Sequence, residues 1–284
     1  MPDAPFDHSA APLRIGRVHL TTRDLPSLEA FYRDAIGLTV HSSSPTHSTL
    51  GTPHTPLIEL TATPDAPARN PRDAGLFHTA FLLPDRAALG RWLAHAGKLG
   101  LRLHGASDHR VSEALYLADP DGNGIEIYAD RPPSQWHDAE GHIAMTTEPL
   151  DLPALRAASD TDWTGFPADG TIGHVHLQVG DTAQADAFYA GILGLDITAR
   201  YPGASFYGSG GYHHQLAGNI WNSRGACPRP KGATGLAALD LIPRDAPTRD
   251  ALLHRATQAG QPATLTDTAA RLQDPWGTAI LLPA

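Results

Sequence analysis

Alternating and helical patterns of apolar side chains follow one another near the start of the chain. The stretch GRVHLTT, residues 16–22, alternates and is partly β-branched, which predicts a strand. Asp24 can cap the helix that follows, Pro26 fits its first turn, and Gly37 ends it. Apolar side chains recur along one face of this helix: Leu28, Phe31, Tyr32 and Ile36. Short segments with Gly and Pro turns come next, so the predicted order is βαβββ.

The same pattern returns in the second half of the chain. IGRVHLTTRDLPSLEAFYRDAIGL begins at Ile15, and IGHVHLQVGDTAQADAFYAGILGL begins at Ile172. These residues recur 157 positions later without a gap: Gly16, Val18, His19, Leu20, Asp24, Ala30, Phe31, Tyr32, Gly37 and Leu38. So many identities at one offset indicate a tandem duplication.

Each half contains a second, weaker repeat. GLFHTAFLLPDRAALGRWLAHAGKLG starts at Gly75, and GLAALDLIPRDAPTRDALLHRATQAG starts at Gly235. Both units close with related segments, DPDGNGIEIY and DPWGTAILLP. We therefore predict an α+β fold of four βαβββ modules, near residues 13–62, 75–130, 171–222 and 235–284. The predicted domain plan is a tail at 1–12, a first two-module domain at 13–130, a connector at 131–170 and a second two-module domain at 171–284.

Residues that commonly bind metals fall at related places in the first half. His19 and His78 lie in the opening strands of the first two modules, and Glu126 lies in the closing strand of the second. If these modules pack with quasi-two-fold symmetry, their opening strands become neighbours, and His19 faces His78. Strand alternation puts Glu126 on the face opposite Ile125 and Ile127. We therefore expect curved mixed sheets that enclose a metal-binding cavity.

The predicted ligand set has a specific chemistry. Two imidazoles and one carboxylate form the facial triad of non-haem Fe(II) sites, which leaves coordination positions open. The same donors suit Mn, Zn, Ni or Co. Glu59 has the same Ile-Glu setting as Glu126, so a set of four ligands is an alternative. A single mid-strand histidine is more often a hydrogen-bonded core residue, and only the joint pattern of His19, His78 and Glu126 favours a metal site.

The second half serves as an internal comparison, because it keeps little of this pattern. The counterparts of His19, His78 and Glu126 there are His176, Ala237 or Ala238, and Leu281. His213 and His214 occur in the segment GGYHHQLAGNIW, where a polar site can persist. We therefore expect a metal site in the first half and a degenerate one in the second.

Composition narrows the class of protein. Charged residues make up 18% of the 284, and the formal net charge is −9, which argues against a nucleic-acid partner. Cys227 is the one cysteine, so neither an internal disulfide nor a thiolate cluster is expected. The first residues carry no basic and apolar signal pattern, and no apolar run reaches membrane-spanning length. We expect a soluble cytoplasmic protein, either a monomer or a homodimer.

The segments HLTTRDLPSLEAFYRDAIGL, GLFHTAFLLP and DPDGNGIEIY resemble the vicinal oxygen chelate superfamily. This family includes glyoxalase I, bleomycin and fosfomycin resistance proteins and type I extradiol dioxygenases. The longer run DHRVSEALYLADPDGNGIEIYADRP, together with GGYHH, is most similar to bacterial catechol-2,3-dioxygenase-like proteins. That resemblance implies Fe(II), a catechol or related aromatic diol as substrate, and O2.

The resemblance also implies roles for individual residues. His19, His78 and Glu126 match the family's two-His-one-carboxylate ligands. Tyr116, ten positions before Glu126, matches a tyrosine that contacts the substrate oxygen, although a packed strand aromatic is the alternative. Two further histidines match acid–base residues of the family: His109, in DHRVS, and His54, in GTPHTPLIEL. A turn residue with local hydrogen bonds is the alternative for the first of them.

Two other functions remain open at the level of sequence. A glyoxalase-like lyase or isomerase would hold Zn or Ni with four ligands, and Glu59 is the feature that favours it. A resistance protein of the same fold would bind a small molecule without catalysis and without metal. The larger two-domain extradiol enzymes hold their metal in the C-terminal half, whereas the triad predicted here lies in the N-terminal half. The fold alone does not decide among these functions.

Overall fold

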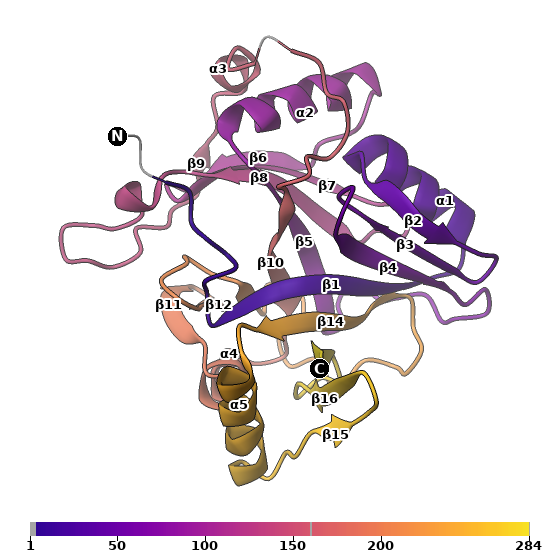
Figure 1. Cartoon of the computed structure of the whole chain (residues 1–284), viewed down its shortest axis with the longest axis vertical. Helices are drawn as coiled ribbons and strands as arrows, with labels where there is room; N and C mark the ends of the chain where they lie inside the picture. The colour runs from indigo at the N-terminus through magenta and orange to yellow at the C-terminus, as the bar shows by residue number, and fades with distance from the viewer. Residues whose placement is uncertain (1–3, 160, 284) are drawn as a thin grey trace. The chain divides into compact units, whose positions relative to one another are not determined.

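The computed structural model describes residues 4–159 and 161–283 of the chain (Figure 1). Part of the predicted tail, one residue of the predicted connector and the last residue of the second predicted domain lie outside these ranges. The described chain has an α+β fold in which strands predominate and helices are few. No helix in the described part of the chain is long and apolar enough to span a bilayer.

The first module has the predicted βαβββ order. Its elements are β1 (Leu13–Thr22), α1 (Leu25–Phe31), β2 (Thr39–Ser43), β3 (His47–Gly51) and β4 (Pro56–Ala62). The Asp24 carboxylate accepts a hydrogen bond from the backbone N–H of Ser27, at 3.1 Å, and so caps α1. A π-helical turn at Tyr32–Ile36 continues the helix, and Gly37 ends it with a φ of +87°. The helix boundaries expected from Asp24 and Gly37 are therefore confirmed.

The other three modules repeat this order. The second contains β5 (Gly75–Leu83), α2 (Arg86–Lys98), β6 (Gly105–Asp108), β7 (Ser112–Ala118) and β8 (Gly124–Asp130). The third contains β10 (Thr171–Gln178), α4 (Thr182–Asp186), β11 (Asp196–Tyr201), β12 (Ala204–Gly208) and β13 (Leu216–Asn219). The fourth contains β14 (Gly235–Pro243), α5 (Ala246–Gln258), β15 (Thr264–Leu265), β16 (Ala269–Gln273) and β17 (Ala279–Pro283). Between the second and third modules lie a 3₁₀ turn (Pro133–Gln135), β9 (Glu148–Pro149) and α3 (Leu152–Arg156).

The strands form two mixed sheets whose order was not foreseen. The eight-stranded sheet has the order β15-β16-β17-β14-β1-β4-β3-β2. The nine-stranded sheet has the order β11-β12-β13-β10-β5-β8-β7-β6-β9. The first module therefore shares its sheet with the fourth, and the second shares its sheet with the third. The prediction that β1 and β5 become neighbours is wrong, because β1 lies beside β14 and β4, whereas β5 lies beside β10 and β8.

By packing, the described chain divides into two compact units. The first comprises residues 4–6, 22–64 and 78–172, and in it α2 packs against β8 and α3 (Figure 1). Its fully buried Trp92 donates a hydrogen bond to the carbonyl oxygen of Ala35, at 3.0 Å. This bond ties α2 to the helix of the preceding module, so the two modules pack through their helices.

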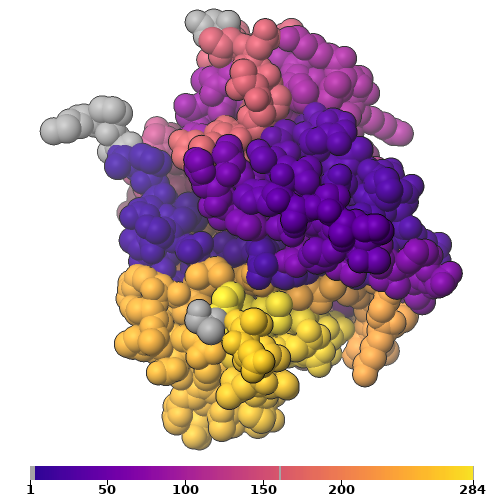
Figure 2. Space-filling model, turned by 45° about the vertical axis from the view of Figure 1, so that its right-hand side comes forward, coloured from indigo at the N-terminus to yellow at the C-terminus, as the bar shows by residue number. Residues whose placement is uncertain are grey.

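The second unit comprises residues 7–21, 65–77 and 173–283. In it α5 packs against β14 and against the π-helical turn Ala187–Ile192, which continues α4. The Arg255 guanidinium donates hydrogen bonds to the carbonyl oxygens of Ile192 and Leu193, at 3.0 and 2.8 Å. The end of the fourth module, yellow in Figure 2, lies on the face of the molecule that the figure shows.

A buried hydrogen bond repeated in both units reflects the duplication. Tyr32 donates to Asp119 at 3.1 Å in the first unit, and Tyr189 donates to Asp274 at 2.8 Å in the second. Both tyrosines are fully buried, and each ties a helix to the turn before a closing strand. Burial, followed by the nearby carboxylate, raises the pKa of both phenols well above the usual value. The tandem repeat seen in the sequence is thus matched by an equivalent buried hydrogen bond in each unit.

Candidate metal centre

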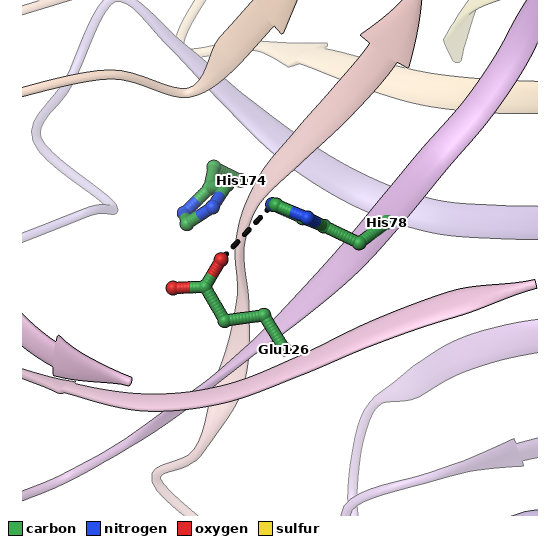
Figure 3. Close-up of side chains that lie close together, drawn as sticks. All are labelled: His78, Glu126 and His174. Atoms are coloured by element: carbon green, nitrogen blue, oxygen red, sulfur yellow. Dashed lines mark ion pairs between the residues drawn. The ribbon is translucent and has the colours of Figure 1, made fainter. Parts of the chain in front are cut away.

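Neighbouring parallel strands bring His78 and Glu126 together. In the register of β5 and β8, His78 lies opposite Gly124 and Ala80 lies opposite Glu126. The two side chains therefore point to the same face of the sheet, two residues apart. His78 Nε2 lies 2.9 Å from Glu126 Oε2, and the side chains are only 8% and 3% exposed (Figure 3). An isolated carboxylate at this depth would be costly, and the imidazole supplies a partner for it.

His174 on β10 is the third residue of this group. One ligand atom from each of His78, Glu126 and His174 can be chosen so that all three atoms lie within 4.8 Å of one another (Figure 3). All three residues are buried. Among residues 4–159 and 161–283, these three alone form such a group of histidine, cysteine or carboxylate side chains. Two imidazole nitrogens and one carboxylate oxygen are the donor set of the facial triad, so the group fits a divalent metal with open coordination positions.

Tyr116 and His109 extend the group along one hairpin. Tyr116 lies opposite Glu126 in the register of β7 and β8, and its ring centroid is 5.7 Å from that of His78. The Tyr116 hydroxyl is 2.7 Å from His109 Nε2, and His109 Nδ1 is 2.6 Å from the carbonyl oxygen of Thr146. Because a carbonyl oxygen only accepts, His109 Nδ1 carries a proton, and in the neutral ring Nε2 is an acceptor.

The environment of Tyr116 keeps its phenol protonated. Burial is the largest cause, and the charge of Glu126 and a hydrogen bond to that carboxylate act in the same direction. Together they raise the pKa of Tyr116 well above its usual value. The phenolic proton is therefore retained beside the metal-binding group across the physiological pH range.

The chain is similar to known proteins over most of its length. The family model of the Glyoxalase/Bleomycin resistance protein/Dioxygenase superfamily matches residues 14–127 and 171–274, which is most of the chain. The chain belongs to this superfamily. The match covers parts of all four modules and confirms the resemblance seen in the sequence.

Individual relatives place the chain more narrowly within the superfamily. A Bacillus subtilis (strain 168) protein named catechol-2,3-dioxygenase is 42% identical over 92% of this chain and 93% of its own. Biphenyl-2,3-diol 1,2-dioxygenase 3 of Rhodococcus globerulus is 31% identical over 41% of this chain and 63% of its own. Among solved structures, glyoxalase I from Zea mays is 16% identical, covers 97% of this chain and 94% of its own, and has a TM-score of 0.58. At that identity the last likeness shows a shared fold only.

His19, which the sequence predicted as a metal ligand, lies outside the group of three potential ligands. His19 Nε2 lies 2.8 Å from Asp240 Oδ1, and Arg17 Nε lies 2.8 Å from Asp240 Oδ2. Burial alone would raise the pKa of Asp240, but the hydrogen bonds from His19 and Arg17 outweigh it and hold that pKa below the usual range. His19 is not brought into the group with His78, because β1 and β5 belong to different sheets.

The tandem repeat relates this ion pair to the metal-binding group. At the offset of 157 residues, His174 corresponds to Arg17, and His176 corresponds to His19. At this offset Arg17 thus stands in the eight-stranded sheet where the nine-stranded sheet has the potential metal ligand His174. The Arg17 guanidinium supplies a positive charge beside the Asp240 carboxylate from within the chain.

His174 was not among the predicted ligands, although the sequence carries a signal for it. The segment GHVHLQ carries two histidines at alternate positions of a strand, and alternate side chains share one face. His176 drew attention because it repeats His19, whereas His174 has no histidine counterpart in the first half. A comparison of repeated residues therefore misses His174, because this position differs between the two halves.

The other two residues named from the sequence lie on the eight-stranded sheet or beside it. His54 is exposed in the turn between β3 and β4, where its backbone N–H donates to Thr52 Oγ1 at 3.2 Å. Glu59 lies on β4, and His47 Nε2 is 2.7 Å from its Oε1. The structure brings neither His54 nor Glu59 into the group of three potential ligands.

A pair of histidines in the second unit lies beside His174 instead. The ring centroid of His214 is 4.2 Å from that of His174, and His214 is 5% exposed. His213 Nδ1 and His214 Nδ1 are 2.8 Å apart, so one of these nitrogens donates to the other. The polar site expected around His213 and His214 is thus next to a candidate metal ligand.

Proposed function

We propose that this protein is a metal-dependent extradiol ring-cleaving dioxygenase that acts on catechol or a related aromatic diol with O2. The observation that carries the proposal is the buried group of His78, Glu126 and His174, which offers two imidazoles and one carboxylate. The relative named catechol-2,3-dioxygenase, at 42% identity over nearly the whole chain, supports the same reaction class.

Fe(II) is the metal that we propose for this group, with Mn, Zn or Ni as alternatives for the same donors. Its proposed ligands are His78, Glu126 and His174, and His174 replaces His19 in the set expected from the sequence. A bound divalent metal, with two neutral imidazoles and one carboxylate, would keep a net positive charge, lower the pKa of a chelating diol and hold two reactants in contact.

The protein's own residues would handle protons around the bound diol. The His214 imidazole, whose ring lies next to His174, is the group that we propose takes a proton from a diol hydroxyl. Tyr116 would orient a substrate hydroxyl by accepting a hydrogen bond at its phenolic oxygen, because its own proton is donated to His109 Nε2. His109 fixes the Tyr116 hydroxyl through Nε2, while its own Nδ1–H is held by the Thr146 carbonyl. These roles assign proton transfer to His214 and substrate orientation to Tyr116.

The glyoxalase-like alternative depended on Glu59 as a fourth ligand. Glu59 instead pairs with His47 on the eight-stranded sheet. The likeness to glyoxalase I from Zea mays concerns the fold and not the reaction. No structural observation therefore favours the lyase over the dioxygenase, and the same holds for a resistance protein that binds without metal. Cytoplasmic location and the choice between monomer and homodimer stay predictions.

The test is a metal analysis followed by an activity assay. The protein is purified without oxygen, its bound metals are measured by elemental analysis, it is reloaded with Fe(II), and catechol with O2 is monitored for a yellow ring-cleavage product. We expect stoichiometric Fe or Mn and product formation, both abolished by His78→Ala. His142→Ala is the matched control, because the His142 side chain is 77% exposed. Zn or Ni without ring cleavage would favour the lyase, and absence of metal would contradict both enzyme functions.

A further inference from the structure

A run of aromatic rings continues outward from His174 within the second unit. The ring of His214 contacts that of Phe206, at 5.1 Å between centroids, and Phe206 contacts His176 at 5.7 Å. His176 then contacts Phe77 at 5.0 Å and Trp221 at 5.6 Å. We call Phe77, His176, Phe206 and Trp221 the aromatic wall. It links a candidate metal ligand to a tryptophan that is 50% exposed.

The strand register explains why these rings can meet. Ala217 on β13 lies opposite Phe206 of β12 on one side and opposite His176 of β10 on the other. The three side chains therefore share one face of the sheet, and the central one is only a methyl group. The larger rings on either side lean over Ala217 and contact each other, which makes the surface of the wall continuous.

Polar atoms in and beside the wall already have partners. The Asn219 side-chain amide nitrogen is 3.0 Å from His176 Nε2, and its oxygen accepts from the backbone N–H of Trp221. The Trp221 indole N–H donates to the carbonyl oxygen of Pro202 at 2.9 Å. Gln178, on the same strand as His176, donates to two backbone carbonyls and accepts from Asn222. The polar atoms in and beside the wall are thus already engaged, and what remains for contact with a ligand is aromatic, chiefly the indole of Trp221.

A half-exposed indole that continues a cluster of aromatic rings is informative, because contiguous apolar surface, unlike a single exposed apolar side chain, often marks a binding site. Its N–H is fixed by Pro202, so its orientation is set before any ligand arrives. Aromatic surfaces of this kind bind flat apolar groups by offset or edge-to-face packing. A charged substituent would lose its hydration there without gaining a partner.

We propose that the aromatic wall determines substrate specificity and selects aromatic diols that carry an apolar aryl or alkyl substituent over diols that carry a charged one. This inference rests on the proposed function, because it takes the diol itself to be held near His174. In this arrangement the substituent lies along Phe206 and His176 and reaches Trp221. Trp221 and Phe206 are thus specificity-determining residues.

The kinetic test compares three diols on the Fe(II)-loaded enzyme: catechol, 3-phenylcatechol and 3,4-dihydroxybenzoate. We expect kcat/KM for 3-phenylcatechol to exceed that for 3,4-dihydroxybenzoate by at least about tenfold. Trp221→Ala is expected to lower the ratio of kcat/KM for 3-phenylcatechol to that for catechol by about tenfold, and Trp221→Phe by less. Leu265→Ala is the control, since Leu265 is another exposed apolar side chain, 71% exposed, on β15. Equal ratios in the wild type and Trp221→Ala would overturn the proposal.

A binding measurement separates the wall from the reaction. The probe is 2-hydroxybiphenyl, which has a single hydroxyl and so lacks the second oxygen of a diol. Its affinity is measured by calorimetry and by quenching of tryptophan fluorescence. We expect it to bind more tightly than phenol, and Trp221→Ala and Ala217→Leu to weaken it about tenfold while Leu265→Ala leaves it unchanged. Tight, Trp221-dependent binding without cleavage of any diol would support the wall and contradict the dioxygenase. Cleavage of diols with no preference for 2-hydroxybiphenyl over phenol would support the dioxygenase and contradict the role of the aromatic wall.

Discussion

Removal of the His174 imidazole tests the metal-binding group most directly. The side chain is buried, and it supplies one of three potential ligand atoms that lie within 4.8 Å of one another. Loss of a residue that only orients a ligand lowers metal affinity by about 10- to 100-fold. Loss of a ligand itself should lower metal affinity further. His174→Ala should therefore weaken metal binding by at least about 100-fold, or about 2.8 kcal/mol.

His19→Ala is the matched variant, because it removes the histidine that the sequence predicted as a ligand in place of His174. Asp240 would keep the Arg17 guanidinium, at 2.8 Å, as a partner. We therefore expect metal affinity to be unchanged, and the free energy of unfolding to fall by about 1.5–3 kcal/mol for the lost hydrogen bond to a carboxylate.

The assay is competition for Fe(II) against a chromogenic chelator without oxygen, with elemental analysis of the recovered protein and circular dichroism to confirm folding. Loss of metal in His174→Ala together with retention in His19→Ala is the expected result. If His19→Ala loses the metal while a folded His174→Ala keeps it, the ligand set expected from the sequence is correct, and the reasoning from the structure is refuted.

Three further predictions concern neighbouring groups. Tyr116→Phe removes the hydroxyl that contacts His109, so kcat should fall about 100-fold with metal content unchanged, as oxygen uptake will show. Burial, opposed by hydrogen bonds from Asn123 and Tyr32, raises the pKa of Asp119 from 3.8 to about 6. The protonated form is favoured by folding, so its contribution is fully present below pH 3.8 and is lost as the pH rises through 6. The unfolding free energy of the wild type relative to Asp119→Asn should therefore fall by about 2 kcal/mol between pH 4 and 7 in urea titrations, and a pH-independent difference would contradict this. Arg17→Met leaves the buried Asp240 with one partner fewer and should destabilise the protein by about 3 kcal/mol, an effect that Asp240→Asn in the same chain should reduce.

Local patterns in the sequence were sufficient to predict the modules. The cap at Asp24 and the turn at Gly37 bound the first helix as expected, because capping and a positive φ depend on neighbouring residues. Alternation along β8 placed Glu126 on the face opposite its isoleucine neighbours, and the structure pairs it there with His78. These two residues lie on adjacent strands of one module, so no long-range arrangement had to be assumed.

Only the tertiary structure decided which third residue joins them. Sequence periodicity fixes the face on which a strand side chain lies, but it carries no information on which distant strand becomes the neighbour. The pairing of modules within the first half, which would have brought in His19, was as consistent with the pattern as the observed sheet in which β10 lies beside β5. That choice depends on the packing of whole modules over long separations in the chain, and it brought His174 to the group while His19 paired with Asp240.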